Sequence, residues 1–343
     1  MSTPRHIRLG SRGSALALWQ TEHVATLLRG LYPGLSVETV VIQTRGDTYK
    51  DRPLPSIGGK GLFTLELEER LRRGGIDGAV HSLKDLPVID PDGIVLGAIP
   101  TRDDVADALV VRGAREEGQN LGNGLSVLRE GAVVGTGSRR RAAQLLARRP
   151  DLQIVDIRGN VDTRVRKALD PAGDYDAVVL AVAGLRRLGM EARISVTLPF
   201  ETMLPAPGQG ALAVQCRQET EWLAFFGGID DTWARAAVTA ERAFLAQLGG
   251  GCRASVGALG ESRENGADAR GGSDVRPVVR LRLWGRVSAP DGSRQVDAQT
   301  TGPRDEPDQL GRALAQQVLR QGAQEILEQI AKTDGMPNDN RQP

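Results

Sequence analysis

The 343-residue sequence predicts an α/β protein of two or three domains. Its first part reads as strand, helix, strand, with a serine before the helical pattern and a Pro-Gly pair after it. Two further strand–turn–helix units follow one another between residues 133 and 167. Such units build open sheets that bind ligands at the carboxyl ends of their strands.

Arginines occupy the turns of the middle units, where helices are expected to begin. Ser138 is the expected N-cap of a helix whose first turn holds three arginines, residues 139–141, and Arg158 precedes Asn160, the next expected N-cap. Positive side chains in a first turn oppose the helix dipole and cost roughly a few tenths of a kcal/mol. Because N–H groups and arginines together bind anions, we predict that these turns receive anionic groups from outside the chain. The alternative is a solvated basic face.

The opening unit repeats this arrangement. A short strand over 6–9 leads to Arg12 and Ser14, which lie in the turn before a helix over 15–29. Ser14 is the expected N-cap, and a strand over 37–43 completes the unit. We therefore expect Arg12 at the same kind of ligand-binding edge as the arginines of the middle units.

The remaining elements follow from apolar periodicity and from Gly and Pro at their ends. A long polar loop over 44–60 comes first, and loops of this length inside a domain are commonly functional. The helix over 230–248 should bury one apolar face, formed by Trp233, Ala237, Ala240, Phe244 and Leu248. Other helices are expected at 62–73 and 308–330, and strands at 78–80, 94–99, 108–111, 177–181, 211–215, 256–259, 278–287 and 295–300.

Composition argues against several classes of protein. Lys and Arg number 44 against 43 Asp and Glu, and aromatic residues make up only 3%, which disfavours a general nucleic-acid binder. A dense arginine cluster in a near-neutral chain favours a small polyanionic ligand. Two cysteines are too few for a disulfide framework or a structural zinc site. With no apolar leader and no run of membrane-spanning length, we expect a cytoplasmic protein with reduced thiols and no metal.

Two places along the chain carry residues suited to catalysis. Lys84 and Asp85 follow a buried-looking strand, so Asp85 is a candidate acid–base or cation-stabilising group, with a surface ion pair as the alternative. Cys252 follows three glycines, which leave its thiol accessible as a nucleophile or attachment point, with a buried inert cysteine as the alternative. Cys216 lies in an apolar strand pattern and is expected in the core.

Motifs spread over the whole chain resemble the porphobilinogen deaminase family, also called the hydroxymethylbilane synthases. Each motif is weak alone, and the set is specific. They are Arg12 to Gln20, Gly59 to Phe63, His81 to Pro87, Gly135 to Gln144, Arg158 to Val161, Pro205 to Val214, and Glu241 to Cys252.

The resemblance implies three α/β domains. The first two would be similar to type II periplasmic binding proteins, with a cleft between them, and the third would be a smaller α/β domain with an antiparallel sheet. The implied boundaries are 1–107 with 208–226 for the first domain, 108–207 for the second and 227–343 for the third, with a disordered tail after about residue 332.

The resemblance also implies a transferase of tetrapyrrole and heme biosynthesis. Such an enzyme joins four porphobilinogen molecules head to tail, each with loss of ammonia, onto a dipyrromethane cofactor held on Cys252 by a thioether. Hydrolysis then releases hydroxymethylbilane. Because the family is usually monomeric, we expect a monomer with a small-molecule substrate and with no nucleic-acid or membrane partner.

By motif position, the resemblance assigns residues to the site. Asp85 would stabilise the azafulvene cation that remains when ammonia leaves, and would manage protons during ring attack. Every pyrrole carries acetate and propionate, so the growing chain is a polyanion that needs many cations. Besides Cys252, the implied cofactor-binding residues are Asp47, Ser82, Lys84, Ser138, Arg140 and Arg141, and the implied substrate-binding residues are Arg12, Ser14, Lys60, Arg158, Arg164 and Arg187.

Three positions depart from the family pattern. Arg139 stands where an apolar or acidic residue is usual and is expected to face solvent, Ser255 replaces a proline after the cysteine, and Ser56 replaces a lysine of the long loop. Two other functions compete with the enzyme. A non-catalytic solute-binding protein would have no use for Cys252 or a third domain, and a nucleic-acid binder would lose affinity steeply with salt.

Overall fold

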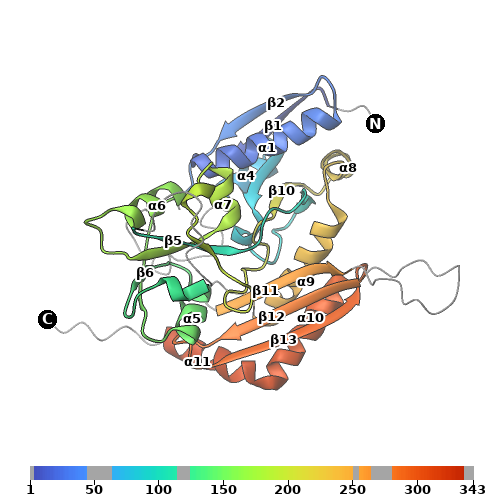
Figure 1. Cartoon of the computed structure of the whole chain (residues 1–343). Helices are drawn as coiled ribbons and strands as arrows, with labels where there is room; N and C mark the ends of the chain where they lie inside the picture. The colour runs from blue at the N-terminus through green and yellow to red at the C-terminus, as the bar shows by residue number, and fades with distance from the viewer. Residues whose placement is uncertain (1–3, 45–63, 114–123, 250–254, 264–279, 336–343) are drawn as a thin grey trace, which may run out of the picture.

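The computed structural model describes residues 4–44, 64–113, 124–249, 255–263 and 280–335 (Figure 1). Within these ranges the chain forms two five-stranded sheets and one three-stranded sheet, with helices packed on them. The expected α/β class is therefore confirmed. No helix in the described ranges is long and apolar enough to cross a membrane.

The first sheet has the strand order β2-β1-β3-β10-β4. β1 pairs in parallel with β2 and β3, whereas β10 runs antiparallel to β3 and β4. Val24 and Leu28 of α1 pack with Ile7 and Leu9 of β1 in one apolar cluster, which confirms the expected strand–helix–strand opening. The bounds are β1 His6–Ser11, α1 Ala15–Leu31, β2 Ser36–Val41, α4 Leu65–Arg72, β3 Gly78–Ser82, β4 Ile94–Ala98, β10 Leu212–Arg217 and α8 Thr220–Gly227.

The second sheet repeats this plan with the order β7-β6-β8-β5-β9. β6 pairs in parallel with β7 and β8, and β5 runs antiparallel to β8 and β9. In each sheet one antiparallel strand lies next to the edge: β10 in the first sheet and β5 in the second. The chain reaches β5 by crossing from the first sheet to the second, and reaches β10 by crossing back. The bounds are β5 Asp107–Val111, β6 Val133–Gly135, α5 Arg139–Arg148, β7 Gln153–Val155, α6 Val161–Leu169, β8 Ala177–Ala181, α7 Val182–Arg187 and β9 Val196–Thr197.

The domain boundaries near residues 107 and 208 stay a prediction, and strand membership supports it. β5 begins at Asp107 and belongs to the second sheet, whereas β10 begins at Leu212 and belongs to the first. Separate apolar clusters lie on the two sheets, one centred on β1 and β10 and others on β5, β6 and β8.

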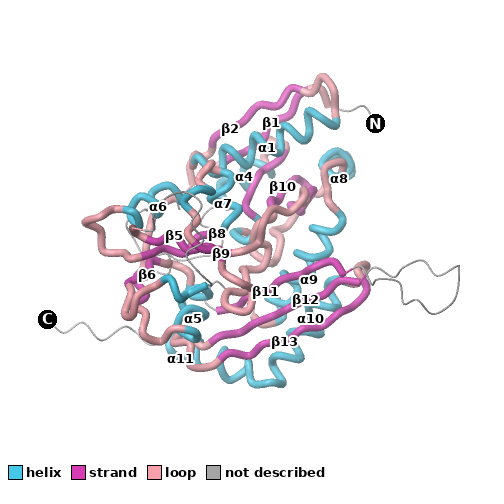
Figure 2. The backbone as a smooth tube through the Cα atoms, in the orientation of Figure 1, coloured by secondary structure: helices cyan, strands magenta, loops and turns pink. Residues whose placement is uncertain are grey.

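The third sheet is an antiparallel meander of β11 (Ser255–Arg263), β12 (Arg280–Ser288) and β13 (Gln295–Pro303). One face of it is covered by α9 (Thr232–Gln247) and α10 (Pro307–Val318), as Figure 2 shows. Four residues of the expected apolar helix face lie in this core: Ala237, Ala240, Phe244 and Leu248. Trp233, in the first turn of α9, lies outside this core and is half-buried, and the guanidinium carbon of Arg304 lies 4.3 Å from the centre of its ring.

The single closing helix expected over 308–330 is wrong. α10 ends at Val318, and a wide turn over Leu319–Ala323 leads to α11 (Gln324–Gly335). Gly322 adopts a φ of 102°, a left-handed conformation that breaks a helix and that glycine adopts most easily. α11 continues to Gly335, three residues beyond the expected start of the tail.

Two buried polar groups join the third sheet to the other two. Glu241 of α9 accepts hydrogen bonds from Arg102, which follows β4, and from the backbone N–H of Gly208, which precedes β10. Arg286 of β12 donates from Nη1 to Oε1 of Gln144 in α5 at 2.8 Å. The third sheet therefore holds both the crossing connections and the arginine-bearing helix α5.

Candidate active site

Lys84 and Asp85 lie in a short 3-10 turn, Leu83–Asp85, directly after β3. Leu83 and Leu86 are buried and anchor this turn, while the side chains of Lys84 and Asp85 reach solvent. Lys84 is nevertheless surrounded by protein, and this desolvation, together with the charge of Arg141, lowers the pKa of Lys84 to about 8. Lys84 therefore contacts solvent and also lies within electrostatic reach of Arg141.

Arg140 and Arg141 meet an anion that belongs to the chain itself. Arg140 Nη2 donates to Asp107 Oδ2 at 2.7 Å, and Arg141 donates to Asp107 Oδ1 from Nε at 3.1 Å and from Nη2 at 2.7 Å. Burial raises the pKa of Asp107, but the two guanidiniums outweigh it and hold the pKa well below its ordinary value. The prediction that anions come from outside thus missed an internal partner, and an external ligand here stays a prediction.

Gln209 connects Asp107 to Lys84. Its Nε2 donates to Asp107 Oδ1 at 2.9 Å, and its Oε1 accepts from Lys84 Nζ at 3.2 Å. Gln209 lies between Gly208 and Gly210, whose φ values of 77° and 82° favour glycine, and a Cβ on Gly210 would lie 2.5 Å from the carbonyl oxygen of Asp103. Sequence reasoning missed Asp107 and Gln209, although one acidic residue at the start of an apolar strand was a signal.

Two further predicted arginines lie near the start of α6: Arg164 within the helix and Arg158 in the turn before it. Arg158 Nε donates to Asp156 Oδ2 at 2.8 Å, and Arg164 Nε donates to the carbonyl of Gly159 at 2.8 Å. Burial and the charges of Arg141 and Arg158 lower the pKa of Arg164, while the charges of Asp156 and then Asp85 oppose this shift. The Asp85 carboxylate of the first sheet and arginines of the second therefore lie near enough to interact.

The helix starts follow the expected N-caps in part. Ser14 accepts from the N–H of Ala17 at 3.2 Å, and Ser138 accepts from the N–H of Arg141 at 3.4 Å, so both caps are confirmed. Asn160 occupies the N-cap position of α6, but its side chain makes no capping hydrogen bond.

The other described site residues of the first sheet lie at the ends of β1 and β3. Ser82 accepts a hydrogen bond from Gln20 Nε2 at 2.8 Å. The neighbouring His81 is buried, and desolvation followed by the charge of Arg12 lowers the pKa of His81 to about 4. Arg12, which follows β1, therefore acts electrostatically on the end of β3, beside Ser82.

Arg187 ends α7 and lies where the second sheet's helices meet α1. Its Nη2 donates to the carbonyl of Gly210 at 2.6 Å, and its Nε lies 3.2 Å from Asp103 Oδ2. Its guanidinium also lies 5.7 Å from the ring centre of Trp19 in α1. These contacts place Arg187 between the two units, and a role in binding substrate stays a prediction.

Several predicted residues lie outside the described residues: Asp47, Ser56, Lys60 and Cys252. Two other departures from the family pattern are described. Arg139 is half-buried rather than fully exposed, and Ser255 is buried as the first residue of β11.

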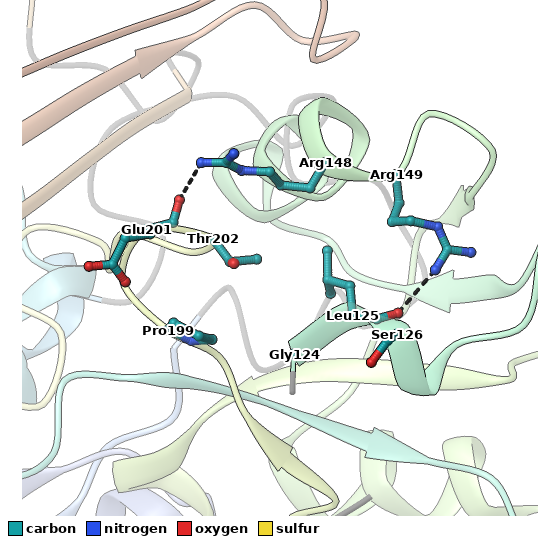
Figure 3. Close-up of a pocket in the computed structure, with 8 residues that line it drawn as sticks. All are labelled: Gly124, Leu125, Ser126, Arg148, Arg149, Pro199, Glu201 and Thr202. Atoms are coloured by element: carbon teal, nitrogen blue, oxygen red, sulfur yellow. Dashed lines mark hydrogen bonds between the residues drawn. The ribbon is translucent and has the colours of Figure 1, made fainter. Parts of the chain in front are cut away.

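A pocket of about 500 Å³ has a lining that includes neither Lys84 and Asp85 nor Asp107 and its two arginines (Figure 3). Its two arginines have backbone partners: Arg148 Nη2 donates to the carbonyl of Glu201 at 2.7 Å, and Arg149 Nη1 to that of Leu125 at 3.0 Å. None of the predicted site residues that the structure describes lines it. The lining is Gly124, Leu125, Ser126, Arg148, Arg149, Pro199, Glu201 and Thr202.

Comparisons with known proteins agree with the sequence motifs. Residues 7–224 match the family model of the porphobilinogen deaminase dipyromethane cofactor binding domain, and residues 235–320 match that of the porphobilinogen deaminase C-terminal domain. A porphobilinogen deaminase of Roseiflexus castenholzii is 46% identical over 94% of this chain and 98% of its own. One of Stenotrophomonas maltophilia is 47% identical over the same shares.

Likeness to solved structures is weaker. The methionine binding protein MetQ aligns with 65% of this chain and 89% of its own at 15% identity and a TM-score of 0.39. At that score the likeness adds nothing to what the described sheets show. Family models that span most of the sequence and near-full-length relatives are decisive, and the chain belongs to the porphobilinogen deaminase family, whose cofactor-binding domain it carries.

Proposed function

We propose that this chain joins four porphobilinogen molecules head to tail with loss of ammonia and releases hydroxymethylbilane, with Asp85 as its catalytic carboxylate. One observation carries the assignment of the site. Asp85 lies at the end of β3 in the first sheet, and its charge acts on Arg164 of the second sheet, which also feels Arg141 and Arg158. A carboxylate within electrostatic reach of several cations suits a substrate that carries acidic side chains and reacts through a cation.

Asp85 supports both halves of the substrate chemistry. When porphobilinogen loses ammonia, positive charge develops on its pyrrole, and a nearby carboxylate stabilises that charge. When a second pyrrole then attacks this cation, the attacking ring must lose the proton from the carbon that forms the new bond, and the same carboxylate would accept it. The arginines meanwhile bind acetate and propionate groups and orient the ring against Asp85.

The residues present fit a dipyrromethane cofactor. The described hydrogen bonds use two of the five N–H donors of Arg140 and three of the five of Arg141, so both retain donors for ligand carboxylates. When bound, dipyrromethane supplies the covalent primer to which pyrrole units are added. The residues that would hold it are Ser82, Lys84, Ser138, Arg140 and Arg141, with Asp47 and Cys252 from outside the described residues.

Substrate carboxylates would bind to Arg12, Ser14, Arg158, Arg164 and Arg187, with Lys60 from outside the described residues. The Ser14 oxygen accepts the capping hydrogen bond, which leaves its own O–H to donate. Arg158 uses Nε on Asp156 and Arg164 uses Nε on Gly159, so the terminal nitrogens that form bidentate contacts are not used in these two bonds.

Intact mass spectrometry of the denatured protein tests this proposal. The wild type should carry extra mass on Cys252 and gain further mass stepwise when porphobilinogen is added. Asp85→Asn should keep the initial extra mass but gain further mass far more slowly. Asp92→Asn, which alters an exposed carboxylate in the turn before β4, is the matched control and should behave as wild type.

The same measurement decides against the competing function. A non-catalytic solute binder would show only the bare polypeptide mass, and porphobilinogen would be recovered unchanged. A monomeric state and a cytoplasmic location stay predictions, which sedimentation and cell fractionation would test.

A further inference from the structure

Asp107 is a fully buried carboxylate that receives hydrogen bonds from three side chains. It lies at the start of β5 with no exposed surface. Arg140 binds Oδ2, whereas Arg141 and Gln209 bind Oδ1. A buried carboxylate is costly unless its charge and lone pairs are satisfied, and these donors satisfy both.

Each arginine is fixed at a second point by a backbone carbonyl. Arg140 Nη1 donates to Leu204 at 2.6 Å, and Arg141 Nη1 donates to Val179 at 2.9 Å. A planar guanidinium that is held at two points has a defined orientation. Asp107 carries one negative charge, and Arg140 and Arg141 carry one positive charge each. The three side chains together therefore keep a net positive charge that is available to ligand anions.

Asp107 and its two arginines are also connected to the Leu83–Asp85 turn that follows β3 of the first sheet. Gln209 holds Asp107 with its amide nitrogen and Lys84 with its amide oxygen, at 2.9 Å and 3.2 Å. The backbone of Gln209 is itself fixed, because its carbonyl accepts from Arg102 Nε at 2.9 Å. Lys84 of the first sheet is thus connected by hydrogen bonds, through Gln209 and Asp107, to Arg140 and Arg141 of the second.

We propose that Asp107 is a positioning residue for the reaction: it holds Arg140 and Arg141 in the orientation that binds ligand carboxylates and, through Gln209, sets Lys84 against them. The inference rests on the proposed function and adds a residue that need not touch the substrate. Groups oriented before a ligand arrives bind it more tightly, because their ordering cost is already met.

Two simpler roles for Asp107 give different results. If Asp107 only reduced the positive charge of the site, replacing it with Asn would add one net positive charge and lower KM for porphobilinogen. If Asp107 only stabilised the fold, Asn would lower the melting temperature and leave KM unchanged. The positioning role predicts a higher KM in spite of the added positive charge.

The chain offers a matched control in Asp176, which also bridges two arginines in the second sheet's unit. It binds Arg112 Nη2 at 2.9 Å and Arg129 Nη2 at 2.7 Å, and it accepts from the N–H of Val133 at 2.8 Å. Asp176→Asn therefore removes a similar two-arginine carboxylate from the same unit, but not one that is linked to Lys84.

The test compares Asp107→Asn and Asp176→Asn, each assayed well below its own melting temperature. Asp107→Asn should raise KM about tenfold or more, the size expected when a charge-assisted contact loses its geometry. It should also purify with a smaller fraction of polypeptide carrying the extra mass on Cys252. Asp176→Asn should lower the melting temperature alone. An unchanged or lower KM in Asp107→Asn overturns the proposal.

A second variant covers the case in which Asp107→Asn does not fold. Gln209→Met keeps Asp107 and both arginines but removes the connection to Lys84, so KM should still rise, and an unchanged KM overturns the proposal. A wild-type chain that carries no extra mass and consumes no porphobilinogen would refute the proposed function and this inference with it. An unchanged KM in Asp107→Asn or Gln209→Met would refute only the positioning role of Asp107 and would leave the proposed function standing.

Discussion

Glu241 and Arg102 form a buried, two-pronged ion pair between α9 and the connection that follows β4. The Nη1 and Nη2 of Arg102 donate to Oε1 and Oε2 of Glu241 at 2.7 Å and 3.0 Å. The same two oxygens accept from the N–H groups of Gly260 and Gly208, each at 2.7 Å. One carboxylate therefore binds the third sheet to both crossing connections of the other two.

Replacing Glu241 with Ala should destabilise the protein strongly. Removing one partner of a buried ion pair leaves the other charge uncompensated, which costs about 3–5 kcal/mol. Glu69→Ala is the control, because Glu69 pairs with Arg73 on an exposed helix surface and should cost less than about 1 kcal/mol. Calorimetric melting would measure the loss of stability in both variants. Equal losses would show that the buried ion pair of Glu241 contributes no more than an exposed one.

Arg164→Ala should lower activity without lowering the stability of the fold. Burial and the like charges of Arg141 and Arg158 lower the pKa of Arg164, so the folded protein holds this cation against repulsion. Its removal should leave the melting temperature unchanged or raised. If Arg164 binds a substrate carboxylate, kcat/KM should fall by about tenfold or more, for a lost contact of roughly 1.5–3 kcal/mol. Arg166→Ala, exposed on the same helix, is the control. Full activity of Arg164→Ala would remove Arg164 from the site.

Local features of the site could be predicted from the sequence, and long-range pairings could not. Ser14 and Ser138 are recognisable as N-caps because a cap depends on residues three positions away. Asp107 meets Arg140 across 33 residues, and Glu241 meets Arg102 across 139, so only the folded sheets bring these groups together. The break at Gly322 was missed because apolar periodicity continues through it, whereas one glycine in a left-handed conformation is enough to end α10.

The activity of the enzyme should depend on the protonation of Lys84. Desolvation and the charge of Arg141 lower the pKa of Lys84 from 10.5 to about 8, so the ammonium is lost as the pH rises through about 8. If the ammonium binds ligand carboxylates, kcat/KM should fall on the alkaline side near that pH. Lys84→Arg should move this fall to higher pH, because a guanidinium stays protonated. An alkaline limb that does not move in Lys84→Arg would assign it to another group.

The same shift in the pKa of Lys84 should make the folded protein more stable as the pH rises, whereas it should make the enzyme less active. Between pH 8 and 10.5 the unfolded chain keeps the Lys84 proton and the folded chain does not, so this residue contributes stability that grows as the pH rises through that window. Lys84→Met should remove this contribution and flatten the corresponding slope of melting temperature against pH. A slope that stays the same in Lys84→Met would mean that Lys84 titrates at its ordinary value.

The two cysteines should differ completely in reactivity. Cys216 lies on β10 with no exposed surface, and burial raises its pKa to about 11, so it stays a thiol and reacts slowly in the folded protein. A thioether on Cys252 survives reductant and denaturant, so the unfolded wild type should offer a maleimide one thiol of the two cysteines in the sequence. Cys216→Ala should then offer none and keep the extra mass, whereas Cys252→Ala should offer one and lose it. Two free thiols in the unfolded wild type would contradict covalent attachment at Cys252.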